Sequence, residues 1–587
     1  MAHRSRTHRQ FAASAASLAA ASALGIGAAA GAVQGAETKD FFLVTTTEDG
    51  APGSLRHALA QANATSGAAT IFLERDKTYQ LTCTAGGQLT SAEELIIVGN
   101  GSSIQQTCPG NRVLLHDSAD ELVVSDVTMF DGNSVRDRHA GNGGAIMASG
   151  TVTLVDATLT DNTASGAGGG IYAAGSITLI NSHVDNNGVD GDGGSGLWMN
   201  DANGLVTMRH SSVNNNLSAN GTPYAGIYAM GGVDMEYSEV NGNVAEFSVS
   251  GIFAGGDVAL TSSSVNENEA GSNAGIVITN GASGLLTDSS VDGNVVFDAN
   301  AGIVLDGGSD ETTNALELVR SSVSDNKGQG GLGILTYDRT DVHLDESAVD
   351  NNVAVGTGGY PDDVGITVVD GDVTLINSSV SGNAADNGSS VGISVTIGNI
   401  NVQASTVADN SAAGDGAGVS TAHGRVTVDD STIADNLAEN GRAGVIGTAV
   451  ELTYATVAEN QGTESSAIDA IDFSTVSSVI APASLGGPLC VVARTDSGGF
   501  NFEQGSDTCG LGYGAHDVVN GDDARLGGLT DNGGPTPTME PQRGSPLLNQ
   551  IPRSATVCAG EDQRGVPRPQ GGRCDVGAVE RVPWRGD

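Results

Sequence analysis

The sequence predicts an all-β protein in which short strands wind into a single parallel β-helix of about 13 coils. Composition favours repeats over an ordinary globular core, because the 587 residues include 85 Gly and only 4% aromatic residues. The hydrophobic residues, 39% of the chain, recur in register and argue against disorder. A phrase ending in Asn returns at spacings of 24 to 32 residues, which is too variable for helical repeats of fixed length.

The repeated phrase keeps one side-chain face constant and leaves the other face free. The residue eight before each terminal Asn is Leu, Met or Val, and the residue three before it is Leu, Val or Ile. The residue five before is Ser or Ala, whereas the residue six before is chemically unrelated from copy to copy. This pattern indicates strands that bury one face. The twelve phrases end at Asn162, Asn187, Asn216, Asn243, Asn268, Asn294, Asn326, Asn352, Asn383, Asn410, Asn436 and Asn460.

The invariant Asn is interpreted as a structural residue. Asn tolerates left-handed backbone at a tight turn, and stacked amides can hydrogen-bond to one another along a ladder. A further member is expected at Asn133. We therefore expect this column to stabilise the coils and not to bind a ligand.

A second constant pair, a small residue followed by an aliphatic one, lies upstream in each coil. It begins as Ala145-Ile146 and returns eleven times, from Gly170-Ile171 to Gly444-Val445. Gly suits a bend at the start of a strand, where a Cβ atom would crowd the neighbouring coil. A single coil cannot bury its apolar face alone, so the coils are expected to stack in parallel around one continuous core.

The two ends of the chain predict an export signal and two caps. Arg4, Arg6 and Arg9 precede an apolar, Ala-rich run, as in export signals. A short amphipathic helix is expected after Ser54, its N-cap. No later run is apolar for 18 residues, so no transmembrane segment is expected in the mature chain. The expected segments are the export signal (1–36), the N-terminal cap with the first coils (37–120), the repeats (121–465) and the C-terminal cap (466–587).

The six Cys fall in three local couples near the two ends of the chain. In an exported chain, such couples predict disulfides that staple the end regions. Of the fifteen possible connectivities of six Cys, we expect the local one. It joins Cys83 to Cys108, Cys490 to Cys509, and Cys558 to Cys574.

Charge restricts the possible partners. A formal net charge of −44 repels nucleic acid and anionic lipid at long range. Partners are therefore expected to be neutral, cationic or bridged by divalent ions, and nucleic acid is not expected.

Several longer motifs resemble known families. "FFLVTTTEDGAPGSLRHALAQAN" and the Asn-ended coils resemble exported right-handed parallel β-helix proteins of the pectin-lyase-like superfold. "LGGLTDNGGPTPTMEPQRGSPLLNQ" and "EDQRGVPRPQGGRCDVGAVE" resemble the C-terminal choice-of-anchor Q region of bacterial surface proteins. The opening repeat, "FDGNSVRDRHAGNGGAI", is similar to repeats of chlamydial polymorphic outer-membrane proteins. These resemblances imply a secreted, extracellular or cell-surface protein with a right-handed β-helix.

An outward aromatic stripe is the strongest candidate for ligand binding. The position after the small-aliphatic pair reads Tyr172, Trp198, Tyr228 and Phe253 in successive coils. Aromatic faces about 4.8 Å apart can bind a glycan chain or an apolar partner segment. The alternatives are an aromatic ladder that stabilises only itself, or a stripe covered by another segment.

A weaker candidate is a Ca²⁺ site in "DNNGVDGDGG". Asp185, Asp190 and Asp192 could supply oxygen ligands. Their spacing does not match an EF-hand, and a solvated, Gly-rich turn is the alternative interpretation.

Catalysis is the main rival to binding, because the resembled superfold includes polysaccharide lyases and hydrolases. A Ca²⁺-dependent lyase needs an acidic cluster beside a basic residue, and an inverting hydrolase needs carboxylates about 6.5–9.5 Å apart. The basic residues of the coils lie in different columns, and Asp370 with Asp372 is the closest approach to a carboxylate group. We therefore predict a non-catalytic, adhesin-like protein that binds glycan or another surface component. A polysaccharide lyase or hydrolase and a purely structural rod are the alternatives.

Overall fold

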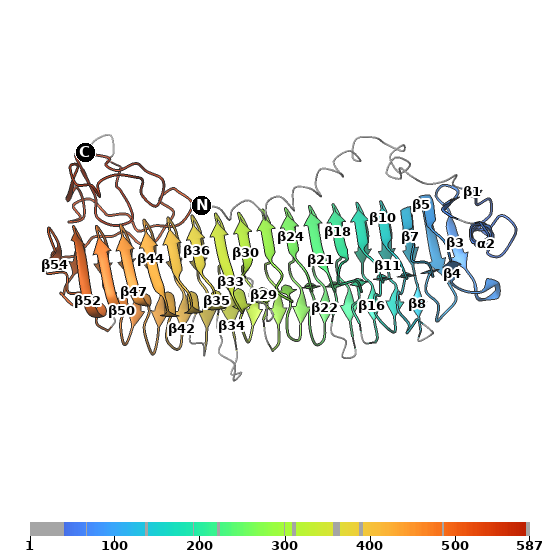
Figure 1. The fold of residues 1–587 in the computed structure, drawn as a ribbon, viewed down its shortest axis with the longest axis horizontal. Helices are drawn as coiled ribbons and strands as arrows, with labels where there is room; N and C mark the ends of the chain where they lie inside the picture. Colours follow the sequence, from blue (N-terminus) through green and yellow to red (C-terminus); the bar gives the residue numbers. More distant parts are fainter. Residues whose placement is uncertain are drawn as a thin grey trace.

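The structure is a computed structural model, and it describes residues 40–582 except 66, 136–138, 192, 220–223, 299, 308–312, 356–363, 387–390, 484–486 and 513. The described chain forms a long rod of stacked parallel coils (Figure 1). About 17 coils are present, so at about 4.8 Å per coil the rod is on the order of 80 Å long. The expected export signal, residues 1–36, lies outside the described residues.

Each coil runs in turn through four ladders of parallel strands. The first ladder starts at the aliphatic member of the small-aliphatic pair, and the second follows after a short bend. The first ladder comprises β4 (Leu89–Ser91), β6 (Leu114–His116), β9 (Ile146–Ala148), β13 (Ile171–Ala173), β17 (Leu197–Met199), β20 (Ile227–Ala229), β23 (Ile252–Ala254), β26 (Ile276–Ile278), β29 (Ile303–Asp306), β32 (Ile334–Tyr337), β35 (Ile366–Asp370), β39 (Ile393–Ile397) and β43 (Val419–His423). The second comprises β1 (Asp40–Leu43), β2 (Ala69–Phe72), β5 (Leu95–Gln106), β7 (Leu122–Phe130), β10 (Val152–Val155), β14 (Ile177–Ile180), β18 (Leu205–Arg209), β21 (Gly232–Glu236), β24 (Val258–Thr261), β27 (Gly284–Thr287), β30 (Asn314–Val319), β33 (Thr340–Asp345), β36 (Val373–Ile376), β40 (Ile400–Gln403) and β44 (Arg425–Asp429). Three long strands span both ladders, namely β47 (Val445–Thr453), β50 (Ile468–Val476) and β52 (Cys490–Gly499).

The third and fourth ladders complete each coil on either side of the ladder Asn. In its middle coils the third ladder is reduced to single bridging residues, from Ser212 to Ala348. Its strands are β3 (Thr78–Leu81), the C-terminal halves of β5 and β7, β11 (Thr158–Thr160), β15 (His183–Asp185), β37 (Ser379–Ser381), β41 (Thr406–Ala408), β45 (Thr432–Ala434), β48 (Thr456–Ala458), β51 (Val479–Ala481), β53 (Phe502–Gln504) and β54 (Val518–Gly521). The fourth ladder comprises β8 (Asn133–Ser134), β12 (Thr163–Ala164), β16 (Gly188–Val189), β19 (Leu217–Ser218), β22 (Val244–Ala245), β25 (Glu269–Ala270), β28 (Val295–Val296), β31 (Lys327–Gly328), β34 (Val353–Ala354), β38 (Ala384–Ala385), β42 (Ser411–Ala412), β46 (Leu437–Ala438) and β49 (Gln461–Gly462).

The remaining elements lie at the two ends of the rod. The predicted N-terminal helix is present as α2 (Leu55–Ala62), and the Oγ atom of its N-cap Ser54 accepts the His57 N–H at 3.2 Å. A short 3-10 helix, η1 (Cys83–Ala85), follows. The irregular C-terminal region contains one small antiparallel pair, β55 (Ile551–Pro552) with β56 (Arg573–Cys574).

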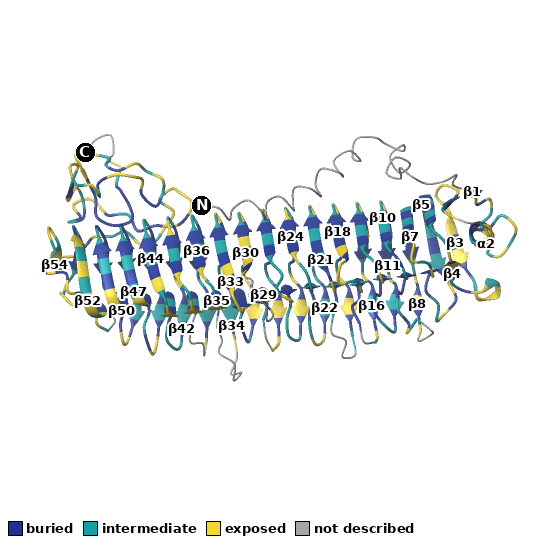
Figure 2. Ribbon diagram, in the orientation of Figure 1, coloured by how far each residue is buried: buried dark blue, intermediate teal, exposed yellow. Residues whose placement is uncertain are grey.

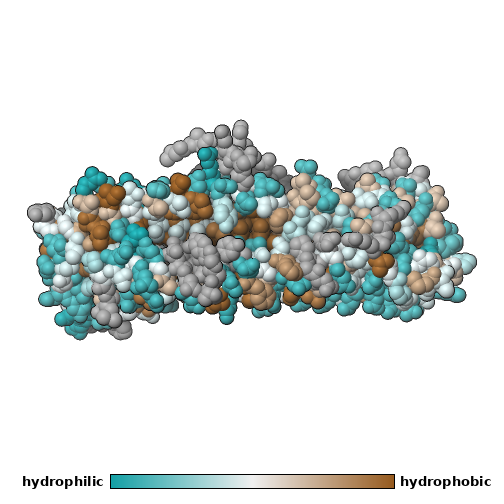
Figure 3. Space-filling view, turned by 90° about the horizontal axis from the view of Figure 1, so that it is seen from below, coloured by the Kyte–Doolittle hydropathy of each residue, from teal (hydrophilic) through white to brown (hydrophobic). Residues whose placement is uncertain are grey.

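The inward side chains of all coils meet in one continuous core. A single cluster of buried hydrophobic residues extends from Val44 to Leu511. Buried and more exposed residues alternate along the strands (Figure 2), as expected when one strand face packs inward. The outer surface is mixed, and on the face seen in Figure 3 hydrophobic side chains gather in small patches among hydrophilic ones.

The coil number exceeds the predicted 13 because the Asn phrase marks only the middle of the rod. Strands β2 and β5 precede the first phrase, while β50 and β52 follow the last one and keep the same parallel pairing. The solenoid thus continues past residue 465 into the segment that we assigned to the C-terminal cap.

The twelve Asn form an unbroken ladder of buried amides. Each side chain is at most 1% exposed. From Asn162 to Asn436, every Nδ2 atom donates to the Oδ1 atom of the next Asn at 2.9 to 3.2 Å. The same Nδ2 atoms also donate to a backbone carbonyl of the preceding coil. The ladder ties neighbouring coils together with no contribution from solvent.

Two details of the Asn prediction are corrected. The left-handed residue is not the Asn but the one before it, with φ between +55° and +68° in all twelve coils. The residue six before the Asn is also left-handed, with φ between +43° and +51°. The expected thirteenth member, Asn133, is exposed and begins β8. Gly132 takes that place in the ladder and donates its N–H to Asn162 Oδ1 at 2.9 Å.

Gly in the small-aliphatic pair is required by close approach between coils. A Cβ atom on Gly226 would lie 2.4 Å from the carbonyl oxygen of Gly251, and one on Gly251 would lie 2.2 Å from that of Gly275. These distances are far below van der Waals contact, so the predicted reason for Gly is confirmed.

Three disulfides staple the ends of the rod. They join Cys83 to Cys108, Cys490 to Cys509, and Cys558 to Cys574, the local couples expected from the sequence. Disulfides of this kind are typical of oxidising, extracellular environments.

No helix within the described ranges is both long enough and apolar enough to cross a membrane.

Candidate binding groove

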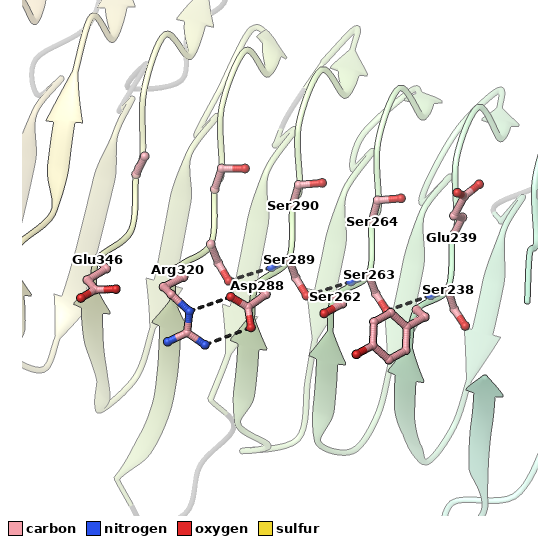
Figure 4. Close-up of a pocket in the computed structure, with 14 residues that line it drawn as sticks. Ser238, Glu239, Ser262, Ser263, Ser264, Asp288, Ser289, Ser290, Arg320 and Glu346 are labelled. Atoms are coloured by element: carbon pink, nitrogen blue, oxygen red, sulfur yellow. Dashed lines mark hydrogen bonds and ion pairs between the residues drawn. The ribbon is translucent and has the colours of Figure 1, made fainter. Parts of the chain in front are cut away.

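A groove runs along the rod over five successive coils, on the outer side of the turn between the second and third ladders (Figure 4). Its volume is about 670 Å³. Three columns line it, lying six, five and four residues before the ladder Asn, which we call the turn, floor and wall positions. The turn positions are Tyr237, Ser262, Asp288, Arg320 and Glu346, the floor positions are Ser238, Ser263, Ser289 and Ser321, and the wall positions are Glu239, Ser264, Ser290, Ser322 and Ala348.

The floor consists of buried serines whose hydrogen bonds are used within the rod. Ser263 receives the Ser238 N–H on its Oγ atom at 3.1 Å, and its own N–H donates to Ser289 Oγ at 3.1 Å. Each floor hydroxyl donates to the carbonyl two residues earlier, as Ser263 does to Thr261 at 2.9 Å. Figure 4 shows the bonds between successive floor serines as a row of dashed lines. The floor is therefore part of the scaffold and offers little to a ligand.

The charged side chains of the groove sit at its turn and wall positions. Arg320 forms a two-point ion pair with Asp288, at 2.6 and 2.9 Å. The hydrogen bonds from this guanidinium hold the pKa of Asp288 below its ordinary value. Glu239 and Glu346 are exposed carboxylates toward the two ends of the groove. Asp288 is thus fixed as an ionised partner of Arg320 and is poorly suited to donate a proton.

An exposed aromatic ring lies at the N-terminal end of the groove. Tyr237 is 54% exposed and stacks on His210, with ring centroids 5.0 Å apart and an interplanar angle of 3°. Because His210 holds one face of the ring, the phenol is a positioned platform rather than a freely rotating side chain.

A row of polar side chains two residues before the ladder Asn, the bridge position, links the coils beside the groove. Asp292 accepts from Ser322 Oγ at 2.7 Å and from the Ser324 N–H at 2.7 Å. Burial raises the pKa values of Asp292 and Asp350, while these hydrogen bonds oppose the shift. The row runs through Asp185, Asn214, Asn241, Asn266, Asp292, Ser324, Asp350 and Ser381.

The wall and bridge positions change in the last three Asn-ended coils, where they read Thr and Ala. Here the C-terminal region, residues 522–582, covers the same face of the rod (Figure 1). Thr406 Oγ1 donates to the Pro537 carbonyl at 2.6 Å, and Thr456 Oγ1 accepts the Ala578 N–H at 3.0 Å. With Ala at the bridge position, the Thr hydroxyls have no bridge side chain to bind and bond the C-terminal region instead. We call this set the docking seam, and it consists of Thr406, Ala408, Thr432, Ala434, Thr456 and Ala458.

Gln563 is the central polar group of the docking seam. Its Oε1 atom accepts from Thr432 Oγ1 at 2.6 Å. Its Nε2 atom donates to the Ser405 carbonyl at 3.0 Å, to Thr406 Oγ1 at 2.8 Å and to Thr536 Oγ1 at 3.0 Å. The "EDQRG" motif therefore places a fully paired carboxamide on the wall of the rod.

Arg568 adds a buried ion pair to the same interface. Its side chain is 0% exposed, and its Nη2 atom lies 2.7 Å from Asp430 Oδ1. The guanidinium carbon lies 3.9 Å from the centre of the Tyr454 ring. Burial raises the pKa of Asp430 to about 6, although the charge of Arg568 pulls it down.

Three carboxylates stack at the left-handed position that precedes the ladder Asn near the docking seam. Asp435 lies between Asp409 and Glu459 in successive coils. Burial, and then the charges of these two neighbours, raise the pKa of Asp435 to about 6. This column lies outside the groove.

The predicted aromatic stripe is present, but its ring faces are used within the protein. Trp198 stacks on Tyr228 at 3.9 Å, and Tyr228 stacks on Phe253 at 5.1 Å. Tyr224, which the sequence did not single out, lies against all three rings at 4.7 to 5.9 Å. Tyr172 is the register neighbour of Trp198 and, like the other three, is half-buried. Burial raises the pKa values of Tyr172 and Tyr228.

The candidate Ca²⁺ residues are only partly described. Asp185 binds the Ser212 hydroxyl at 2.8 Å and the Asn214 N–H at 2.7 Å, so it belongs to the bridge row. Asp190 is exposed, and Asp192 lies outside the described residues. Among the described residues, no group of three or more His, Cys, Asp and Glu side chains is placed to hold a metal ion. Ca²⁺ binding stays a prediction.

The arginines considered for catalysis are engaged in ion pairs. Asp370 lies 4.0 Å from Arg339, and Asp372 accepts the Asn399 N–H at 2.7 Å, so neither carboxylate of that pair is free. The paired arginines of the coils are Arg209 with Asp234 and Glu236, Arg320 with Asp288, Arg339 with Asp370, Arg425 with Glu451, and Arg442 with Asp415 and Asp469.

The groove and the docking seam were missed at the sequence level, although a signal for them exists. The wall and bridge positions read Ser-x-Asn or Ser-x-Asp in coils such as Ser264–Asn266 and Ser290–Asp292. They read Thr-x-Ala in β41, β45 and β48. The change marks where the open face becomes a covered one.

Together these features define the class: an all-β, disulfide-bearing parallel β-helix with an open polar groove and a docked C-terminal region. Comparison with known proteins takes the assignment no further, since no family model, curated protein or solved structure matches the chain.

Proposed function

We propose that this protein is an exported, extracellular or cell-surface rod that binds a glycan chain in the groove without cleaving it. The observation that carries this proposal is the contrast between the groove and the docking seam. Where polypeptide covers the face, the coils read Thr-x-Ala; where the face is open, they carry polar bridge residues and an exposed Tyr237 platform. The polar side chains of the open wall therefore suit a hydrated, hydroxyl-rich partner.

The repeat of the rod favours a linear ligand. Each coil presents a turn and a wall side chain about 4.8 Å from those of the next coil. A chain of similar units laid along the groove meets comparable groups in five successive coils. A sugar ring against Tyr237 adds an apolar contact of the kind that aromatic side chains provide.

Other observations support the proposed extracellular or cell-surface location. The Arg-containing, Ala-rich N-terminus is typical of an export signal, and the three disulfides fit an oxidising compartment. The likeness of the C-terminal motifs to those of bacterial surface proteins supports placement at the cell surface.

The aromatic stripe has less support as a ligand site than the groove. Its central rings stack on one another and on Tyr224, so a ligand would have to displace part of that packing. Cleavage by a lyase or hydrolase has less support than binding, because the coil arginines are held by carboxylates.

The test is a glycan array probed with the wild type and with Tyr237→Asn. Asn accepts the left-handed backbone of this position, where φ is +50°. We expect the substitution to lower binding about tenfold while leaving the melting temperature within a few degrees. Tyr337→Asn, at an aromatic residue 43% exposed outside the groove, is the matched control.

Two results would overturn the proposal. The first is a wild type that binds no glycan on the array, which leaves the purely structural rod. The second is the appearance of unsaturated products or new reducing ends when the protein is incubated with polygalacturonate or alginate, which makes it an enzyme.

A further inference from the structure

We infer that the groove takes a neutral glycan whose sugar units carry acetamido groups, with the amide N–H donating to the serine hydroxyls of the wall. This inference deepens the proposed function and depends on it. The supporting observation is how the C-terminal region of this chain hydrogen-bonds to residues at the same wall position in other coils.

The docking seam shows the hydrogen-bonding state of a wall hydroxyl that has a partner. Thr406 gives its proton to the Pro537 carbonyl at 2.6 Å and accepts the amide Nε2 of Gln563 at 2.8 Å. A hydroxyl has one donor and two acceptor lone pairs, so this arrangement uses the donor and one acceptor. The group that the wall binds at this point is an uncharged carboxamide.

In the open wall, the Ser322 hydroxyl uses its donor in the same way. Ser322 gives its proton to Asp292 Oδ2 at 2.7 Å, so this carboxylate does for Ser322 what the Pro537 carbonyl does for Thr406. The lone pairs of Ser322 remain, and the half-buried side chain lines the groove. Ser290 and Ser264 hold the equivalent places in the two preceding coils, where each already accepts the Nδ2 amide of a bridge-row Asn, at 2.9 and 3.0 Å, and keeps one lone pair. Ser322 therefore has both lone pairs for ligand donors, and Ser290 and Ser264 have one each, in three successive coils.

The charges in the groove disfavour an acidic glycan such as a uronate polymer. Arg320, the one cation lining the groove in the described chain, is held by Asp288. Glu239 and Glu346 are exposed carboxylates, so a uronate polymer would meet like charges and acceptors facing acceptors. An acetamido group supplies an N–H without adding charge.

The experiment is isothermal titration of the full-length protein with three oligosaccharides of equal length. They are an N-acetylglucosamine oligomer, its deacetylated form and a cello-oligosaccharide, which has the same linkage without the amide. We expect the acetylated oligomer to bind at least tenfold more tightly than the other two. In the double variant Ser290→Ala with Ser322→Ala this preference is expected to fall below threefold, whereas Ser394→Ala, an outward serine outside the groove, keeps it.

Each other outcome has a definite meaning. Equal binding of the acetylated and cello forms overturns the acetamido inference and leaves glycan binding standing. Tightest binding of the deacetylated form overturns it in favour of charge recognition by Glu239 and Glu346. A glutamine-rich peptide that binds in place of all three sugars overturns both this inference and the proposed function. Melting curves of every variant separate loss of binding from loss of fold.

Discussion

Asn294 shows why a single residue type recurs at the centre of every coil. Its Oδ1 atom accepts both the N–H and the Nδ2 of Asn268 at 3.0 Å. Its Nδ2 atom donates to Asn326 Oδ1 and to the Val265 carbonyl, again at 3.0 Å. Asp would lack the donors and Leu would lack all four bonds, so the buried column requires the amide. The left-handed residue before it aims this amide along the rod axis.

The first prediction concerns Asn294→Ala. The substitution takes the side-chain partner from the Asn268 N–H and the Val265 carbonyl, inside a region that water does not reach. It also removes one of the two bonds to Asn326 Oδ1, which keeps the backbone N–H of residue 294. We expect a loss of roughly 2–4 kcal/mol in the free energy of unfolding, because each unsatisfied buried group costs about 1–3 kcal/mol. Urea unfolding followed by circular dichroism measures it. Asn203→Ala, at an exposed turn, is the control, and an unchanged midpoint for Asn294→Ala would contradict the ladder's stabilising role.

The second prediction concerns the pH dependence set by Asp435. Its folded pKa of about 6 lies above the ordinary value of 3.8, so the fold favours the protonated form. This contribution is fully present below pH 4 and is lost as pH rises through about 6. We expect Asp435→Asn to raise stability by on the order of 1 kcal/mol at pH 8 and to give no gain at pH 4, since partial exposure screens the effect.

The control for Asp435→Asn is Asp325→Asn at the equivalent left-handed position. Its neighbours in the same column of the adjacent coils are Gly293 and Asn351, so no carboxylate of that column stacks above or below it, and its charge acts only on the bridge residues Asp292 and Asp350. Thermal melts of both variants between pH 4 and pH 8 make the comparison. A gain for Asp435→Asn that is equal at both pH values would count against the stacked-carboxylate explanation.

At the level of the element, inward and outward positions of the strands differ in how far sequence specifies them. Inward positions were predictable, because burial in a repeating core restricts Leu154, Leu179 and their equivalents to similar side chains. The bend glycines were predictable for the same reason, since the neighbouring coil leaves no room for a Cβ atom. The left-handed conformation six residues before the Asn was not predictable, because residues as different as Arg320 and Glu346 adopt it there.

Outward positions depend on what packs against them from elsewhere in the chain. The aromatic stripe was found as a column, but its partner Tyr224 comes from the preceding turn and carries no repeat signal. The role of Thr432 was likewise not predictable from the repeat, because its partner Gln563 lies 131 positions away in the chain. The sequence alone therefore predicted the scaffold well and the groove poorly.

The whole molecule is a repeating rod closed by non-repeating ends. Helix α2 contacts the first strands of the rod, and disulfides lie in both end regions. Between these ends the C-terminal region covers the wall positions of three coils on the C-terminal side of the groove. One Asn-ended coil, with Ser379 at its wall position, lies between the groove and the docking seam.

The third prediction tests that docking with the pair Thr432 and Gln563. Thr432→Val leaves Gln563 Oε1 without its 2.6 Å partner, and Gln563→Met removes the amide while keeping similar bulk. Each substitution is expected to weaken docking by roughly 1–2 kcal/mol, and the double variant by clearly less than the sum, because both remove the same bond. Hydrogen exchange of residues 522–582 measures the opening free energy of the C-terminal region. Thr427→Val, a half-buried position on β44 away from the seam, is the control. Additive losses, or exchange equal to that of the wild type, would mean that the C-terminal region is held by its apolar contacts alone.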